Sequence, residues 1–89
     1  MIVRMWEGTV YPGRFGDAVE WVRRDLVPRA LLSPGCLAAE ILVHEGNPES
    51  VMLVTRWDVA PVFDEGVSES ELFTRARAQH MATLRPDIS

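Results

Sequence analysis

The chain has 89 residues, a length that predicts a single small domain over residues 1–89. Nine arginines, with no lysine, stand against thirteen acidic residues, and the net charge of -4 argues against a nucleic-acid partner. Apolar residues make up 47% of the chain but occur in short runs, whereas a membrane helix needs about 20 in succession, so we expect no membrane partner.

Two further features of the composition bear on location and assembly. Cys36 is the only cysteine, so no internal disulfide can form, and the first ten residues lack the order of a secretory signal. We therefore expect a cytoplasmic protein. Because so short a chain can hide only part of its apolar surface, we also expect the chain to associate with itself as a homodimer.

The first third of the chain predicts a strand followed by a helix. Residues 2–10 mix β-branched and aromatic residues and end at a turn signal. Pro28 lacks an amide donor, so we expect the following helix to loosen over residues 24–27 and to continue over 29–32. The apolar stripe of this helix consists of Phe15, Val19, Val22 and Leu26.

Alternating residues over 36–44 and 51–57 predict two more strands, joined as a hairpin. The register that aligns their apolar sets places Glu40 opposite Arg56, and a shift by one residue would mix the faces. The side predicted to face the helices carries Leu37, Ala39, Ile41, Val43, Val51, Leu53, Thr55 and Trp57.

The remainder of the chain predicts two helices. Asp58 can cap a short helix over residues 60–65, and Ser68 with Glu71 resembles a capping box that opens a longer one. The stripe of the longer helix would carry Leu72, Phe73, Ala76, His80, Met81 and Leu84. Too little chain follows for a full fourth strand.

The order strand, helix, strand, strand, helix is most of a ferredoxin-like split βαβ unit. The predicted class is therefore α+β, an antiparallel sheet with its helices on one face and a fourth strand that is short or missing.

Several segments in this order resemble the antibiotic biosynthesis monooxygenase domain, a family of dimeric α+β barrel proteins. The resembling segments are 1–6, 12–14, 26–29, 33–40 and above all Val54-Thr55-Arg56-Trp57-Asp58. The resemblance implies a homodimer whose sheets face one another, with a ligand pocket between each sheet and its own helices. Some members oxygenate polycyclic aromatic substrates without metal or organic cofactor, one branch opens the porphyrin ring of haem, and many have no known activity.

Two departures from the family pattern bear on function. Oxygenating members can carry a pocket asparagine four residues before the strand-three tryptophan, where this chain has Leu53. The haem-degrading branch uses a first-strand asparagine, matched here by Trp6, and a histidine soon after the tryptophan, whereas residues 58–72 contain none. The second departure argues against haem degradation.

Cofactor-free oxygenation requires an aromatic wall, a base and a donor to a developing oxyanion, because the deprotonated substrate itself supplies electrons to dioxygen. His80 and Glu7 are the candidate catalytic bases. The candidate substrate-binding residues are Trp57, Trp6, Leu53 and Thr55. Trp57 and His80 are also compatible with roles in core packing, which is the more common role of a single histidine on an apolar helix face.

No metal site or nucleotide loop is visible, since His44 and His80 are far apart in sequence and have no close cysteine or histidine companion. We therefore expect no cofactor. The leading hypothesis is a small cofactor-independent monooxygenase-like protein acting on an aromatic or polyketide-derived small molecule. The alternatives are a non-redox polyketide cyclase or isomerase, and a non-catalytic ligand-binding or structural dimer of the same fold.

Overall fold

The protein is an antiparallel sheet with a helical layer on one face. The computed structural model describes residues 1–63, 65 and 71–81, with His80 and Met81 described by their backbone alone. The elements in chain order are β1 (Ile2–Val10), α1 (Phe15–Trp21), the π-helical turn η1 (Val22–Leu26), α2 (Val27–Leu32), β2 (Cys36–Val43), β3 (Ser50–Trp57) and β4 (Phe73–Met81). No helix in these residues is long and apolar enough to cross a membrane.

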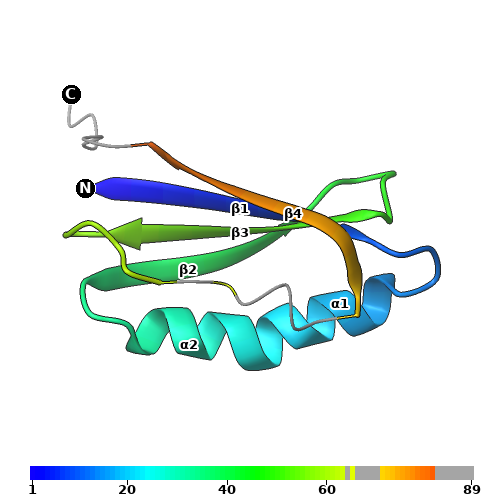
Figure 1. The fold of residues 1–89 in the computed structure, drawn as a ribbon, viewed down its shortest axis with the longest axis horizontal. Helices are drawn as coiled ribbons and strands as arrows, with labels where there is room; N and C mark the ends of the chain where they lie inside the picture. The colour runs from blue at the N-terminus through cyan, green and yellow to red at the C-terminus, as the bar shows by residue number, and fades with distance from the viewer. Residues whose placement is uncertain (64, 66–70, 82–89) are drawn as a thin grey trace.

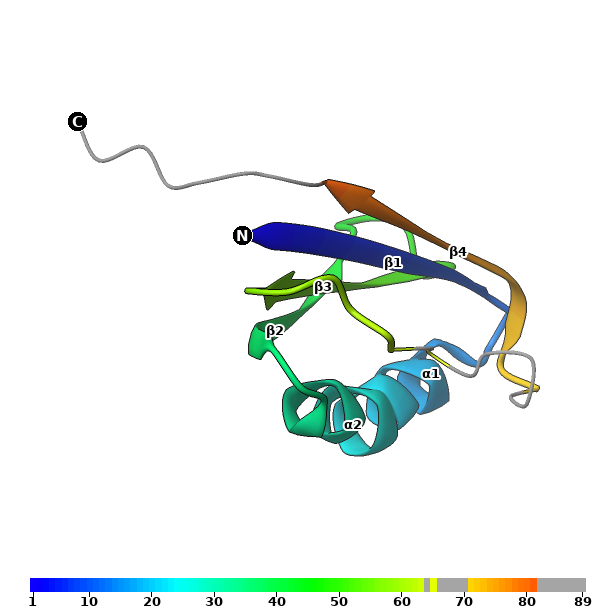
Figure 2. The same cartoon turned by 60° about the vertical axis from the view of Figure 1, so that its left-hand side comes forward.

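The strands lie in the order β2-β3-β1-β4, and each neighbouring pair is antiparallel (Figure 1). The helical layer lies along one side of this sheet, as Figure 2 shows. We call that side the helix-covered face and the opposite side the outer face. The arrangement confirms the predicted α+β class, the antiparallel sheet and the helices on one face.

The helical layer is continuous but changes its winding in the middle. Pro28 cannot donate a backbone hydrogen bond, and the turn before it, η1, widens into a π-helix over Val22–Leu26. The predicted loosening is confirmed, although it begins two residues earlier than expected, and α2 continues to Leu32 as predicted. Val22 and Leu26 are both fully buried, so the widened turn still presents its apolar side to the sheet.

The hairpin of β2 and β3 has the predicted faces but a different register. Arg56 lies opposite Ala38 rather than Glu40, a shift of two residues. The Asn47 amide bonds to the His44 carbonyl at 3.1 Å, which places His44 in the turn instead of the ladder. Because side chains alternate with a period of two, this shift preserves the faces, and Arg56 still approaches the Glu40 carboxylate at 4.0 Å.

The predicted last helix is wrong, because residues 73–81 form strand β4. The fourth strand is therefore present and pairs along β1, with Trp6 opposite Ala78 and Arg4 opposite His80. Alanine, arginine and glutamine favour a helix by only a few tenths of a kcal/mol per residue. One backbone hydrogen bond to β1 contributes a net stabilisation of about the same size or larger, so pairing with β1 can outweigh the helix propensity. The predicted helix positions Ser68 and Leu84 lie outside the described residues.

The short helix predicted over residues 60–65 is also wrong, since residues 60–63 and 65 are neither helix nor strand. Glu65 is held by arginines of two distant elements, Arg4 of β1 and Arg29 of α2. These tertiary contacts outweigh the weak capping signal of Asp58.

The core lies between the sheet and the helical layer. Its buried cluster consists of Trp6, Val10, Ala18, Val22, Leu26, Val51, Leu53 and Phe73. Two residues predicted for the helix-covered core, Leu37 and Val43, are more than half exposed, although Val43 pairs with the buried Val51 and so keeps the predicted face. Leu37 lies at a register irregularity between Cys36 and Ala38, and Val43 ends its strand beside the turn.

Burial raises the pKa of the Cys36 thiol, although a backbone hydrogen bond with Ala38 acts in the opposite direction. Less thiolate is then present at pH 8 in the folded chain than in the unfolded chain. We expect iodoacetamide to alkylate Cys36 more slowly in native buffer than in urea, as followed by mass spectrometry. Equal rates in the two conditions would contradict this prediction.

Candidate functional site

Trp57 ends β3 on the helix-covered face and is completely buried. Its indole Nε1 donates a hydrogen bond to the Thr55 Oγ1 at 2.8 Å. The Thr55 hydroxyl in turn donates to the backbone carbonyl of Arg4 at 3.5 Å. The indole donor is therefore satisfied within the sheet, which fixes the orientation of the ring.

A buried ion pair joins β1 to the segment that follows β3. The Arg4 guanidinium donates from Nε and Nη2 to the two carboxylate oxygens of Glu65, at 2.7 and 2.6 Å. The side chains of Arg4 and Glu65 are only 14% and 6% exposed. This is the bidentate geometry in which arginine binds carboxylates most strongly.

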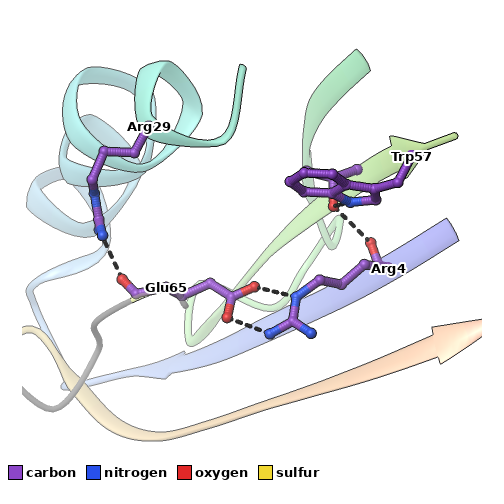
Figure 3. A network of polar contacts seen from close by, with 5 residues as sticks. Arg4, Arg29, Trp57 and Glu65 are labelled. Atoms are coloured by element: carbon purple, nitrogen blue, oxygen red, sulfur yellow. Dashed lines mark hydrogen bonds and ion pairs between the residues drawn. The ribbon is translucent and has the colours of Figure 1, made fainter. Parts of the chain in front are cut away.

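One more side chain, that of Arg29, completes the polar network shown in Figure 3. Arg29 reaches across from α2, and its Nη2 donates to the backbone carbonyl of Glu65 at 2.8 Å. The Arg29 guanidinium carbon also lies 5.8 Å from the centre of the Phe63 ring. That ring lies 6.0 Å from the Trp57 ring at an interplanar angle of 35°. We call Arg4, Thr55, Trp57, Phe63 and Glu65 the interior site.

The interior site is unusual for so small a core. Charged side chains are seldom buried unless paired, and apolar residues of similar volume often stabilise a protein as well as a buried ion pair does, or better. Stability alone therefore does not account for the presence of the Arg4–Glu65 pair at this end of the core. A charged group in a water-poor aromatic setting is a candidate functional site.

Trp6 is buried on the same face but belongs to a different cluster. Its ring lies 5.4 Å from Phe73, edge to face, and 6.5 Å from Trp21. Trp6 pairs with Leu53 whereas Trp57 pairs with Ile2, a separation of four strand positions or about 13 Å along the sheet. The structure brings Thr55 to Trp57, but Trp6 and Leu53 lie in the neighbouring part of the core.

The two candidate bases lie in different places. His80 pairs with Arg4 in the β1–β4 register, so its backbone runs beside the interior site, while its side chain is beyond the described part of the chain. Glu7 lies on the outer face, where it accepts hydrogen bonds from Ser50 at 3.0 Å and Arg77 at 3.2 Å. The structure does not bring Glu7 to Trp57.

The outer face around Glu7 carries a cavity of about 200 Å³. Its lining includes Met5, Glu7, Met52, Arg77 and Gln79. No group of three or more histidine, cysteine, aspartate or glutamate side chains that could hold a metal ion occurs among the residues that the structure describes.

Sequence reasoning missed Glu65 and Phe63 as parts of the interior site, and it missed Arg29 as the side chain that donates to the Glu65 backbone. Glu65 and Phe63 fall within a predicted helix that does not form, and nothing in their spacing relates them to β1. Arg4 shares strand β1 with Trp6 at a spacing of two and so lies on the same face of the sheet. Its carboxylate partner depends on the path of the chain after β3.

No family model and no curated protein matches the chain. Solved structures do match it. One described as an antibiotic biosynthesis monooxygenase is 17% identical, with 96% of this chain and 100% of the other covered and a TM-score of 0.65. A protein of unknown function from Nitrosomonas europaea is 11% identical, with 99% and 93% covered and a TM-score of 0.75.

A third match is a variant of MhuD with two manganese protoporphyrin IX molecules bound per active site. It is 18% identical, with 100% of both chains covered and a TM-score of 0.69. The chain thus has the fold of antibiotic biosynthesis monooxygenase structures, and the predicted resemblance is confirmed at the level of the fold.

Proposed function

We propose that this chain is a small cofactor-independent monooxygenase-like protein that acts on an aromatic or polyketide-derived small molecule. The observation that carries the proposal is the interior site on the helix-covered face. There the residue that holds the buried Glu65 carboxylate, Arg4, is linked through the Thr55 hydroxyl to the fully buried Trp57. The single cysteine, which requires no oxidising compartment, is compatible with a cytoplasmic location.

The proposed reaction follows from the chemistry of an electron-rich phenol or anthrone. Removal of a proton gives an enolate that passes one electron to dioxygen, and recombination of the two radicals gives a peroxide on the ring carbon. Loss of water from the peroxide leaves a carbonyl, so one oxygen atom is incorporated and the other leaves as water. The protein binds the anion, excludes water and handles the proton.

In this proposal Trp57 and Thr55 form the wall at the reacting ring, and Arg4 donates to the substrate oxyanion. Trp6 and Leu53 lie farther along the same face, where they would contact the distal rings of a polycyclic substrate. We assign the base to His80 rather than Glu7, because the backbone of His80 runs beside Arg4 whereas Glu7 lies on the outer face.

A non-catalytic ligand-binding dimer is the second candidate. Leu53, at the position where oxygenating relatives can carry asparagine, is buried in the apolar core cluster. It offers no polar group to a substrate. A non-redox cyclase would need the same wall and base without dioxygen, so oxygen uptake separates it from the monooxygenase. Porphyrin is not proposed, because Trp6 and the lack of histidine in residues 58–72 depart from the haem-degrading pattern.

Oxygen uptake is the direct test of the monooxygenase proposal. The protein is mixed with an anthrone in air-saturated buffer, with and without a chelator, and an oxygen electrode is read against quinone formation. We expect protein-dependent uptake of one dioxygen per quinone formed, with the chelator having no effect. Binding of the anthrone without oxygen uptake or product would favour the ligand-binding dimer. A rearranged product without oxygen uptake would favour the cyclase.

Trp57→Phe tests the aromatic wall, with Trp21→Phe as the matched control outside the interior site. We expect each change to lower the free energy of unfolding by about 1–2 kcal/mol. Only Trp57→Phe should weaken binding of a hydroxyanthraquinone, by roughly 1–3 kcal/mol or at least about fivefold. If binding by the Trp57→Phe variant stays within about twofold of wild type once stability is matched, Trp57 is packing alone.

We also propose a homodimer formed through the outer face, where Met5, Met52 and Leu42 lie on the side of the sheet without helices. Sedimentation should give twice the 10.0 kDa chain mass at micromolar concentration. Met52→Arg should reduce the mass to one chain, because burying an added charged side chain in the interface costs free energy. Leu32→Arg, at an exposed helix end, should leave the mass unchanged. A wild-type monomer would contradict the proposal.

A further inference from the structure

We infer that the interior site binds a planar aromatic anion, and that Glu65 and Phe63 occupy the positions of its charged group and its ring. The ligand would replace the Glu65 carboxylate on Arg4 and the Phe63 ring on Trp57. This inference rests on the proposed function and specifies its ligand class.

The Arg4–Glu65 contact already has the geometry of a bound oxyanion. Nε and Nη2 of Arg4 donate two hydrogen bonds of 2.7 and 2.6 Å to one carboxylate, and both side chains are mostly buried. A guanidinium can donate the same two hydrogen bonds to any planar carboxylate, and it can also donate both to a phenolate or enolate oxygen. Glu65 therefore indicates which charge the site accommodates.

Phe63 marks the place of an aromatic ring in the same way. Its centre lies 6.0 Å from the Trp57 ring, within the range in which aromatic rings attract one another. Arg29 approaches the Phe63 ring at 5.8 Å, a cation–π distance. A ligand ring in this position would contact the same tryptophan and the same cation.

The two groups differ from the rest of the site in how the backbone holds them. Arg4, Thr55 and Trp57 belong to paired strands, so their positions are fixed by the sheet. Phe63 and Glu65 lie in neither helix nor strand, and the Glu65 backbone carbonyl accepts its hydrogen bond from the side chain of Arg29. Exchange of Phe63 and Glu65 for a ligand would therefore break no strand pairing.

One rigid ligand would supply both contacts together. An aromatic acid or a hydroxylated aromatic anion carries its ring and its oxyanion in a fixed relation, so fewer rotatable bonds are ordered than for two separate side chains. The competition has a measurable consequence. Weakening the Arg4–Glu65 bond should raise the affinity for an anionic aromatic ligand and leave that of its neutral isostere nearly unchanged.

The test compares 2-naphthoate with 2-naphthamide, which share ring and shape but differ in charge. Dissociation constants are measured by calorimetry for the wild-type chain and for Glu65→Gln. Asp17→Asn is the matched control, because it removes one negative charge from an exposed pair with Arg14. A double variant, Arg4→Met with Glu65→Met, removes the anion site while retaining apolar volume.

We expect Glu65→Gln to bind 2-naphthoate about tenfold more tightly than wild type, with the amide and Asp17→Asn changing less than about threefold. The double variant should bind the two probes equally. Should Glu65→Gln fail to fold, the comparison of wild type with the double variant decides, because only wild type should prefer naphthoate.

The inference is overturned if folded Glu65→Gln gains no affinity for naphthoate, or if the double variant retains the preference for the anion. Oxygen uptake on anthrone is measured separately. If the protein consumes oxygen with anthrone but the naphthoate measurements do not give the expected differences, this inference is wrong and the proposed function is retained. If naphthoate binding depends on Arg4 but no oxygen is consumed, this inference is retained and the monooxygenase proposal is wrong.

Discussion

Arg4→Met is expected to lower the free energy of unfolding by about 3–5 kcal/mol, because it leaves the Glu65 carboxylate buried without its partner. A chain of 89 residues has roughly 5–13 kcal/mol of stability in total, so this loss is a large part of it. Urea unfolding monitored by tryptophan fluorescence gives the value. Glu65→Met should have an effect of the same sign, because it removes the carboxylate to which the buried Arg4 guanidinium donates two hydrogen bonds.

Two controls separate burial from charge. The double variant, Arg4→Met with Glu65→Met, should lie within about 1 kcal/mol of wild type, since two apolar side chains of similar length replace the pair. Arg56→Met removes an exposed arginine that lies 4.0 Å from Glu40, and it should change the stability by less than about 1 kcal/mol. Equal losses in Arg4→Met and Arg56→Met would show that water screens the Arg4–Glu65 pair.

The second large effect is expected at Gly8 of β1, which lies beneath the aromatic cluster. A Cβ at this position would come within 2.6 Å of the Phe73 ring and 2.7 Å of the Trp6 ring. The Phe73 and Trp6 rings are both buried. Trp6, Trp21 and Phe73 pack against one another, so the Phe73 and Trp6 rings cannot move independently. Gly8→Ala should therefore destabilise the protein by about 1–3 kcal/mol, as measured by thermal or urea unfolding.

Gly16→Ala is the matched control for Gly8→Ala. Gly16 lies in α1 and is exposed, and a Cβ added to it would meet no described atom within 4 Å. Alanine should stabilise the protein there by about 0.5–1 kcal/mol, because it restricts the unfolded chain and favours the helix. The two identical substitutions should thus have opposite signs. A neutral or stabilising Gly8→Ala would mean that the aromatic cluster is loosely packed.

The sequence predicted those parts of the fold in which local pattern and tertiary environment agree. Residues 2–10 and 51–57 combine strand propensity with a single apolar face, and both form strands. The missing amide of Pro28 was enough to predict an irregular turn in the helix. Residues 73–81 were mistaken for a helix because their apolar spacing fits both periods, and the edge of β1 that selects the strand is far away in sequence.

Only those residues of the candidate site that lie on strands could be predicted from the sequence. Trp57 and Thr55 follow from strand alternation, and Arg4 shares a strand with Trp6 at a spacing of two. The other half, Phe63 and Glu65, lies in a segment without periodic structure, where position is determined by long-range contacts with Arg4 and Arg29. Irregular segments carry no repeating signal from which such contacts can be inferred.

The place of β1 in the sheet has a consequence for how the protein folds. β1 comes first in the chain yet lies between β3 and β4, both of which follow the helical layer (Figure 1). Neither edge of β1 can be paired until long loops have closed, and proteins dominated by such contacts fold in about milliseconds to seconds. During that interval the strand carrying Trp6 has two open edges that can pair with another copy of the chain. Refolding yield should therefore fall as protein concentration rises, with misassembly beginning at β1.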